Sequence, residues 1–98
     1  MGFELKELSI KNGEVEYRYI YKVVEAAYDE NKVYGIEVIR NDVKNDTIVN
    51  IEKNEIKLIS PNIEKVKGLL KILYEGLVSP IHLIDIIGEE VDKCVFDF

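Results

Sequence analysis

Two Ser-Pro dipeptides constrain the C-terminal part of this 98-residue chain more than any other feature. Ser60-Pro61 and Ser79-Pro80 contain its only two prolines. A serine suits the N-cap of a helix, where its hydroxyl accepts a hydrogen bond from a free backbone N–H. A proline suits the first helical turn, where its missing N–H costs nothing. We therefore predict helices over about residues 61–77 and 80–95.

Apolar residues recur every three or four positions after each Ser-Pro pair, which is typical of an amphipathic helix. In the first segment they are Ile63, Val66, Leu70, Leu73 and Leu77, and in the second they are Ile84, Ile87, Val91 and Val95. Only four residues, Gly76–Ser79, separate the two segments. A connection this short predicts an antiparallel helical hairpin with one continuous apolar face.

The part of the chain before Ser60 has the alternation of β-strands. Asn12-Gly13, between the apolar runs 3–10 and 15–24, is a strong hairpin signal because both central turn positions favour positive φ. With Asn12 and Gly13 as the central pair, Ile10 faces Val15 and Leu8 faces Tyr17.

That register leaves Phe3 and Leu5 on the opposite face from Leu8. One extra residue in a strand reverses its alternation, so we predict a β-bulge near Lys6-Glu7 that returns them to the apolar face.

Polar turns at 29–32 and 41–46 separate two further predicted strands, Val33–Arg40 and Thr47–Glu52. Residues 54–59 alternate weakly and are predicted as a short extended connection. Sequential strands with short turns predict an antiparallel meander, and one face of such a sheet needs a cover. The predicted fold is therefore α+β: a four-stranded antiparallel meander over about residues 3–59, followed by the two-helix hairpin packed on one face of the sheet. A chain of this size, 47% hydrophobic, suits a single domain over residues 1–98.

The charge balance and the single cysteine exclude several function classes. The chain has 13 basic and 19 acidic residues, a net charge of −6, and no basic face, which argues against nucleic acid or an anionic membrane as its main partner. Cys94 is the only cysteine, so no internal disulfide forms, and its position predicts a buried side chain. We find no signal peptide, long apolar span or lipidation motif, and expect a cytoplasmic protein.

Three stretches carry a resemblance to a known family. They are VYGIEV at Val33–Val38, ISPN at Ile59–Asn62 and, above all, LLKILYEGLVSPIHLIDIIGEEVD at Leu69–Asp92. Together they resemble a family of short proteins, chiefly from spore-forming Gram-positive bacteria, known only as a domain of unknown function. The resemblance implies a bacterial cytoplasmic protein. It implies no activity, cofactor or catalytic residue.

The residues themselves offer little chemistry. There is no glycine-rich phosphate loop, paired cysteine, zinc-protease motif or nucleophile elbow. His82 and Cys94 are each unique, but on one continuous helix they lie about 18 Å apart along the axis, too far for a catalytic pair. Ser79 precedes His82, and a capping role explains it better than a nucleophilic one. We expect no catalytic residue and no cofactor.

His82, Asp85 and Glu89 form the one metal-ligand pattern in the sequence. Their spacing, H-x-x-D-x-x-x-E, puts them on one face of the second predicted helix, where they could bind a divalent metal. Acidic residues are also common on the exposed face of any helix. A metal-binding or small-molecule-binding domain, with or without catalysis, is the alternative function.

Tyr17, Tyr19 and Tyr21 alternate along one predicted strand and could stack on bases or peptides. Glu14, Glu16 and Glu25 surround them instead of the cations that single-stranded nucleic acid requires. We predict that the tyrosines lie on the sheet face under the helices, with their hydroxyls at its rim.

Ile72 and Ile86 point away from the predicted core stripes of their helices. Together with the unpaired edge strands they are the candidate surface for a protein partner or a homodimer. The favoured function is therefore a small non-enzymatic protein-interaction or regulatory domain.

Overall fold

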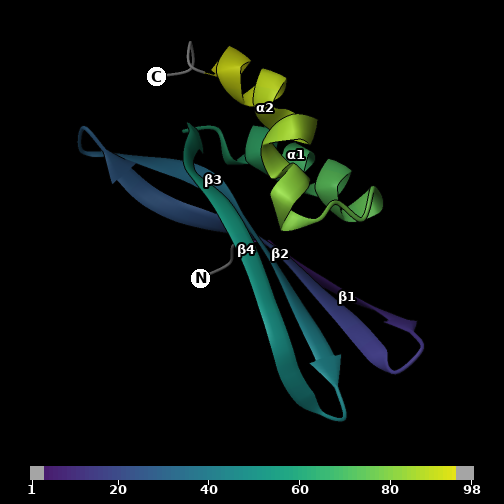
Figure 1. The fold of residues 1–98 in the computed structure, drawn as a ribbon. Coiled ribbons are helices and arrows are strands. Elements are labelled where there is room, and N and C mark those ends of the chain that lie inside the picture. The colour runs from purple at the N-terminus through teal and green to yellow at the C-terminus, as the bar shows by residue number, and fades with distance from the viewer. Residues whose placement is uncertain (1–3, 95–98) are drawn as a thin grey trace.

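Four strands followed by two helices make up the computed structural model, which describes residues 4–94 (Figure 1). In chain order they are β1 (Leu5–Asn12), β2 (Val15–Tyr28), β3 (Asn31–Lys44), β4 (Thr47–Ser60), α1 (Ile63–Glu75), the 3-10 turn η1 (Pro80–His82) and α2 (Leu83–Lys93). The strands form one antiparallel sheet in the order β1-β2-β3-β4. Both helices lie on the same side of it (Figure 1). The predicted α+β meander with a helical cover is confirmed.

The sheet is longer than the sequence predicts. Strands β2, β3 and β4 each have 14 residues, and the molecule measures 45 × 26 × 17 Å. The predicted break at 41–46 shrinks to the turn Asn45-Asp46, and residues 54–59 belong to β4 instead of forming a connection. Backbone pairing with β3 continues through these stretches, because the ladder depends on backbone groups and not on side-chain alternation.

The three hairpin turns each have two central residues. Asp29-Glu30 and Asn45-Asp46 have positive φ at both central positions, between 51° and 66°, as a type I′ turn requires. In the first hairpin the central pair is Gly13-Glu14 instead of the predicted Asn12-Gly13, because Asn12 pairs with Val15. Gly13 has φ +67° and supplies the positive φ of the first central position.

The corrected turn changes the register of the first hairpin by two residues. Ile10 faces Tyr17 and Leu8 faces Tyr19, where the sequence predicted Val15 and Tyr17. Because the side-chain period of a strand is two, this shift keeps Leu8, Ile10 and Tyr17 on their predicted face.

The predicted bulge at Lys6-Glu7 is wrong. Strand β1 pairs with β2 without a shift from Leu5 to Asn12, so Leu5 stays on the face away from the helices and is 52% exposed. Phe3 lies outside the described residues.

The irregularities lie in the β3–β4 ladder instead. The register shifts between Tyr34 and Ile36, and again between Asp42 and Val43. At the first shift, a Cβ on Gly35 would collide with the carbonyl oxygens of Ile56 and Lys57. Glycine is therefore required where the β4 backbone crosses close to β3.

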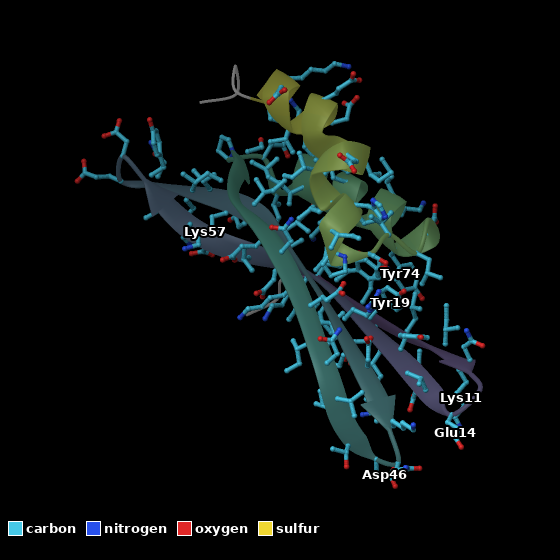
Figure 2. The ribbon with its side chains drawn as sticks, in the orientation of Figure 1. Lys11, Glu14, Tyr19, Asp46, Lys57 and Tyr74 are labelled. Atoms are coloured by element: carbon cyan, nitrogen blue, oxygen red, sulfur yellow. The ribbon has the colours of Figure 1, made fainter. Side chains whose placement is uncertain are left out.

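The core lies between the sheet and the helices. Its fully buried members are Tyr21, Ile36, Val38 and Ile59 from the sheet, Val66, Leu70 and Leu73 from α1, and Leu83 and Ile87 from α2. Figure 2 shows Tyr19 and Tyr74 near the boundary between sheet and helices. The rings of Tyr21 and Tyr74 meet edge to face, with centroids 6.0 Å apart.

The tyrosine row lies on the helix-covered face, as predicted, but the Tyr21 hydroxyl is buried against the Val78 carbonyl and does not reach the predicted rim. Tyr19 is 8% exposed and Tyr21 fully buried, while Tyr17 is partly buried against the core. Cys94 is buried, as the sequence predicts.

Helix α1 begins two residues later than the first Ser-Pro pair indicates. Its N-cap is Asn62, whose Oδ1 accepts a hydrogen bond from the Glu64 N–H (3.0 Å). Ser60 still belongs to β4, where it pairs with Tyr34, and its hydroxyl accepts from the Asn62 N–H (3.0 Å). Ser60 and Pro61 thus form the turn into the helix and are not its predicted cap and first turn.

The second Ser-Pro pair opens η1 and not α2 itself. Ser79 is the N-cap of η1, but its side chain makes no capping bond; its carbonyl accepts from the His82 N–H (2.9 Å). Pro80 occupies the first turn, as predicted. The buried face of α2 differs from the predicted stripe at one position: Leu83, predicted on the flank, is fully buried with Ile87, and Ile84, predicted in the stripe, is 54% exposed. Val95 lies outside the described residues.

The connection between the helices is held by the backbone. The Val78 N–H bonds to the Leu73 carbonyl (3.0 Å) and the Leu77 N–H to the Tyr74 carbonyl (3.2 Å), with Leu77 at φ +51°. These are the bonds of a Schellman motif, which satisfies the last carbonyls of a helix. The Tyr21 hydroxyl donates to the Val78 carbonyl (2.9 Å) and ties this connection to the sheet.

Candidate functional site: the groove between the two helices

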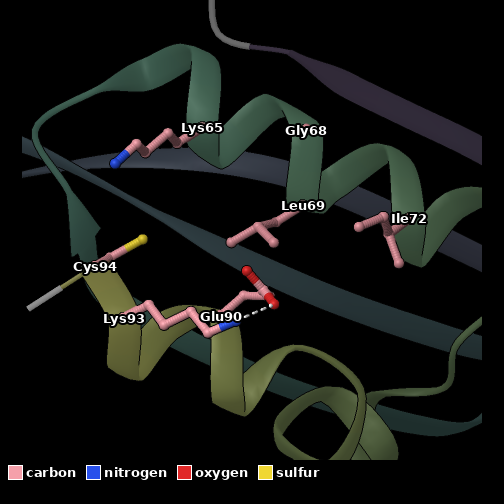
Figure 3. Close-up of a pocket in the computed structure, with 7 residues that line it drawn as sticks. All are labelled: Lys65, Gly68, Leu69, Ile72, Glu90, Lys93 and Cys94. Carbon is pink, nitrogen blue, oxygen red and sulfur yellow. Dashed lines mark hydrogen bonds and ion pairs between the residues drawn. The ribbon is translucent and has the colours of Figure 1, made fainter.

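The two helices pack mainly on the sheet and meet each other sparingly, which leaves a groove between them. This helix groove has a volume of about 460 Å³ and is lined by Lys65, Gly68, Leu69 and Ile72 of α1 and by Glu90, Lys93 and Cys94 at the end of α2 (Figure 3).

The spacing of the lining residues explains why they share the groove. Lys65, Leu69 and Ile72 follow one another at intervals of four and three, so they lie along one flank of α1. Gly68 has no side chain, and a Cβ built on it would have no atom within 4 Å, so the wall of α1 is low at this point.

The groove has an apolar floor and a charged rim. Leu69 and Cys94 are each 7% exposed, and Ile72 is 50% exposed. Figure 3 shows the side chains of Leu69 and Glu90 directed into the gap between the helices. On the rim, Lys93 Nζ lies 3.3 Å from Glu90 Oε1. An apolar floor inside a charged rim suits binding of an apolar group.

The two isoleucines predicted as a partner surface are both half exposed, at 50% each. Ile72 lines the groove. Ile86 is not among the lining residues, but it precedes Glu90 by four positions and Lys93 by seven, and therefore lies on the same flank of α2. Neither residue is needed by the core between helices and sheet.

The predicted metal ligands are exposed. His82 Nδ1 lies 3.5 Å from Asp85 Oδ2, with side chains 58% and 73% exposed. Glu89 is exposed on α2. Within residues 4–94, no group of three or more histidine, cysteine and carboxylate side chains lies close enough to hold a metal ion.

A polar cluster on the helix-facing side of the sheet was missed by sequence reasoning. Arg40 Nε donates to Asp42 Oδ1 (2.9 Å), and Arg40 Nη2 lies 3.2 Å from Glu52 Oε2. Asn50 Nδ2 donates to Asp42 Oδ2 (3.1 Å), and the Arg40 guanidinium stacks over the Tyr17 ring at 5.4 Å. The hydrogen bonds that Arg40 donates to Asp42 raise the pKa of Arg40, which stays charged.

One guanidinium holds both carboxylates of this cluster, while Glu52 Oε1 is buried and makes no hydrogen bond within the described residues. Asp42 is only 9% exposed, and a buried carboxylate is stable only with such partners. The available signal was the alternation of Arg40 and Asp42 in a stretch that the sequence analysis treated partly as a polar turn. We assign the cluster a structural role in the part of the sheet beyond the helices.

No helix in the described part of the chain is both long and apolar enough to span a membrane.

The comparison with protein families gives one result. The model of a family of unknown function (DUF6514) matches residues 3–93. No curated protein and no solved structure matches the chain. Since the match covers nearly the whole sequence, the chain belongs to this family.

Proposed function

We propose that this member of the DUF6514 family is a small non-enzymatic protein-interaction domain that binds a protein partner through the helix groove. The observation that carries the proposal is an apolar floor, Leu69 and Cys94, bordered by the half-exposed Ile72. Ile86 extends the same surface along α2.

The apolar surface supports the proposal energetically. Fully burying an isoleucine stabilises a complex by about 1.5–3 kcal/mol, so covering the exposed half of Ile72 or Ile86 contributes about 1 kcal/mol each. A partner side chain inserted over Leu69 adds to this. Central apolar anchors of this kind dominate the affinity of protein interfaces.

The charges around the groove indicate the kind of partner. The rim carries Lys65, Lys93 and Glu90, and Lys93 is already paired with Glu90. We infer a partner segment that presents an apolar side chain bordered by polar groups, for example one face of an amphipathic helix.

A small-molecule or metal-binding domain, possibly with catalysis, is the second candidate, and the His82–Asp85 contact of 3.5 Å favours it. A rise in melting temperature with Zn²⁺, lost in His82→Ala and reversed by chelator, would favour this second candidate over the first.

Cellular location and source form part of the same proposal. We place the protein in the cytoplasm of a spore-forming Gram-positive bacterium. A single cysteine, Cys94, is compatible with a reducing compartment.

The test is affinity capture from lysate of the source organism, with quantitative mass spectrometry. The bait is compared with the double variant Ile72→Asp, Ile86→Asp and with Ile84→Asp, a matched control that is 54% exposed on another flank of α2. We expect a partner that is enriched by the wild type and by Ile84→Asp and lost, by tenfold or more, with the double variant.

Two results would contradict the proposal. One is identical recovery by all three baits, which would make the groove incidental. The other is loss with Ile84→Asp alone, which would move the binding surface to the other flank of α2. Circular dichroism of each variant shows that it is folded.

A further inference from the structure

Both helices and the core cluster lie on one side of the sheet, and no helix covers the other side within residues 4–94 (Figure 1). We call this other side the outer face. Val33 and Val43 lie on it by register and are buried. Five further apolar residues form a band across all four strands: Leu5, Ile20, Ile39, Ile48 and Ile51. Leu5, Ile48 and Ile51 are 52%, 50% and 58% exposed, and the other two are half-buried.

The strand registers show that the band is continuous. Ile20 and Ile39 face each other directly on β2 and β3. Ile51 faces Asn41 and so lies diagonally next to Ile39, and Leu5 faces Lys22 next to Ile20. Directly opposed side chains lie about 5 Å apart and diagonal ones about 7–8 Å, within contact distance for isoleucine and leucine.

The outer face is electrically balanced on a strongly acidic chain. The charged residues in its paired registers are Lys11, Arg18, Lys22 and Lys53, against Glu7, Glu16, Glu37 and Glu55. Two of the possible pairs are formed: Lys22 Nζ lies 3.0 Å from Glu37 Oε1 and Arg18 Nη2 lies 3.2 Å from Glu16 Oε1. Two copies of a −6 chain repel each other in general, but not where these two faces meet.

The face is large enough for a stable interface. Strands β2, β3 and β4, with 14 residues each, are about 46 Å long at 3.3 Å per residue, and β1, with 8 residues, is about 26 Å long. At about 4.8 Å per strand, one face of the sheet is on the order of 800 Å². A standard interface buries about 800 Å² on each partner, so it would use most of this face.

The β4 edge of the sheet is a poorer site for a second copy than the outer face. Strand β4 carries two register shifts against β3, and irregular edges resist pairing. Asn54 Oδ1 accepts from the Glu55 N–H (2.9 Å), and Asn54 Nδ2 donates to the Pro80 carbonyl (3.3 Å). These bonds occupy the middle of β4.

We propose that a second copy of this chain covers the outer face, sheet against sheet, so that the protein is a homodimer with the two helix grooves on its outside. The contact is made by the apolar band, with the balanced charges around it. This inference does not rest on the function proposed for the helix groove, which lies on the other side of the sheet.

The test is the mass of the protein in solution by sedimentation equilibrium over a range of chain concentrations. The wild type is compared with Ile51→Asp and Leu5→Asp, at two ends of the band, and with Ile84→Asp, an equally exposed isoleucine on α2. We expect twice the mass of one chain for the wild type and for Ile84→Asp. Each band variant is expected to raise the dimer dissociation constant tenfold or more.

Three results would overturn the proposal. They are a wild type with the mass of one chain at every concentration, a dimer unaffected by both band variants, and a dimer dissociated by Ile84→Asp. Leu5 and Ile51 lie on edge strands and are more than half exposed, so substituting either residue leaves the packing of the core unchanged. If circular dichroism shows that one of the two variants is unfolded, the dissociation constant of the other variant tests the proposal.

Discussion

The Tyr21 phenol is fully buried and donates a hydrogen bond to the Val78 carbonyl (2.9 Å). Burial raises the pKa of Tyr21 well above its usual value near 10, because desolvation disfavours the phenolate, and the neighbouring Tyr19 adds to this. The unfolded chain loses this proton near pH 10 and the folded chain keeps it. We therefore expect the free energy of unfolding to fall as the pH rises above 10, by up to about 1.4 kcal/mol per pH unit from this group.

The measurement is urea unfolding of the wild type and of Tyr21→Phe between pH 7 and 11. The variant has no phenol at this position and should lose this part of the pH dependence. At pH 7 it should be less stable by about 1 kcal/mol, because the bond to Val78 is lost. Tyr28→Phe, at a site 51% exposed, is the control and should behave as the wild type. Equal slopes for Tyr21→Phe and the wild type would refute the prediction.

The β3–β4 pair depends on a single glycine. A Cβ on Gly35 would collide with two backbone carbonyl oxygens of β4, which cannot move away as the end of a flexible side chain can. We expect Gly35→Ala to lower the free energy of unfolding by about 3 kcal/mol or more, measured by urea denaturation.

The matched control is Gly68→Ala in α1, where a Cβ would have no atom within 4 Å. Alanine favours a helix interior over glycine, so this variant should be more stable than the wild type by about 0.5–1 kcal/mol. A mild effect of Gly35→Ala, below 1 kcal/mol, would show that β4 can shift its register at this site.

Element types and their order were predictable because they depend on local chemistry. Alternation of apolar residues, turn-forming pairs and helical periodicity each involve residues a few positions apart. Element ends were less predictable. Ser60 and Asn62 are both good N-cap residues, and pairing of Ser60 with Tyr34 decided between them.

At the scale of the whole molecule, the sheet and the helices share one core. Tyr21 and Ile36 of the sheet pack with Leu70 of α1 and Leu83 of α2 in a single buried cluster. We expect one cooperative unfolding transition, because neither layer keeps its apolar face covered without the other. Far-UV and near-UV circular dichroism at one chain concentration should give the same urea midpoint. Loss of helix signal before the tyrosine signal would contradict this.

The candidate site was also only partly predictable from the sequence. The half exposure of Ile72 and Ile86 was predictable from helical periodicity, because each lies off the apolar stripe of its own helix. The groove was not predictable, since Lys65 and Leu69 meet Glu90 and Cys94 only through the spacing of two helices on the sheet.

The sequence by itself determined the α+β class, the meander order, the burial of Tyr21 and Cys94 and the position of the helical hairpin, because each follows from residues close together in the chain. Only the tertiary structure decided the first hairpin's register, the need for glycine at position 35, the Arg40 cluster and the bare outer face. These depend on contacts between distant residues, where the close packing of backbones and the pairing of buried charges select one arrangement among several that local preferences allow.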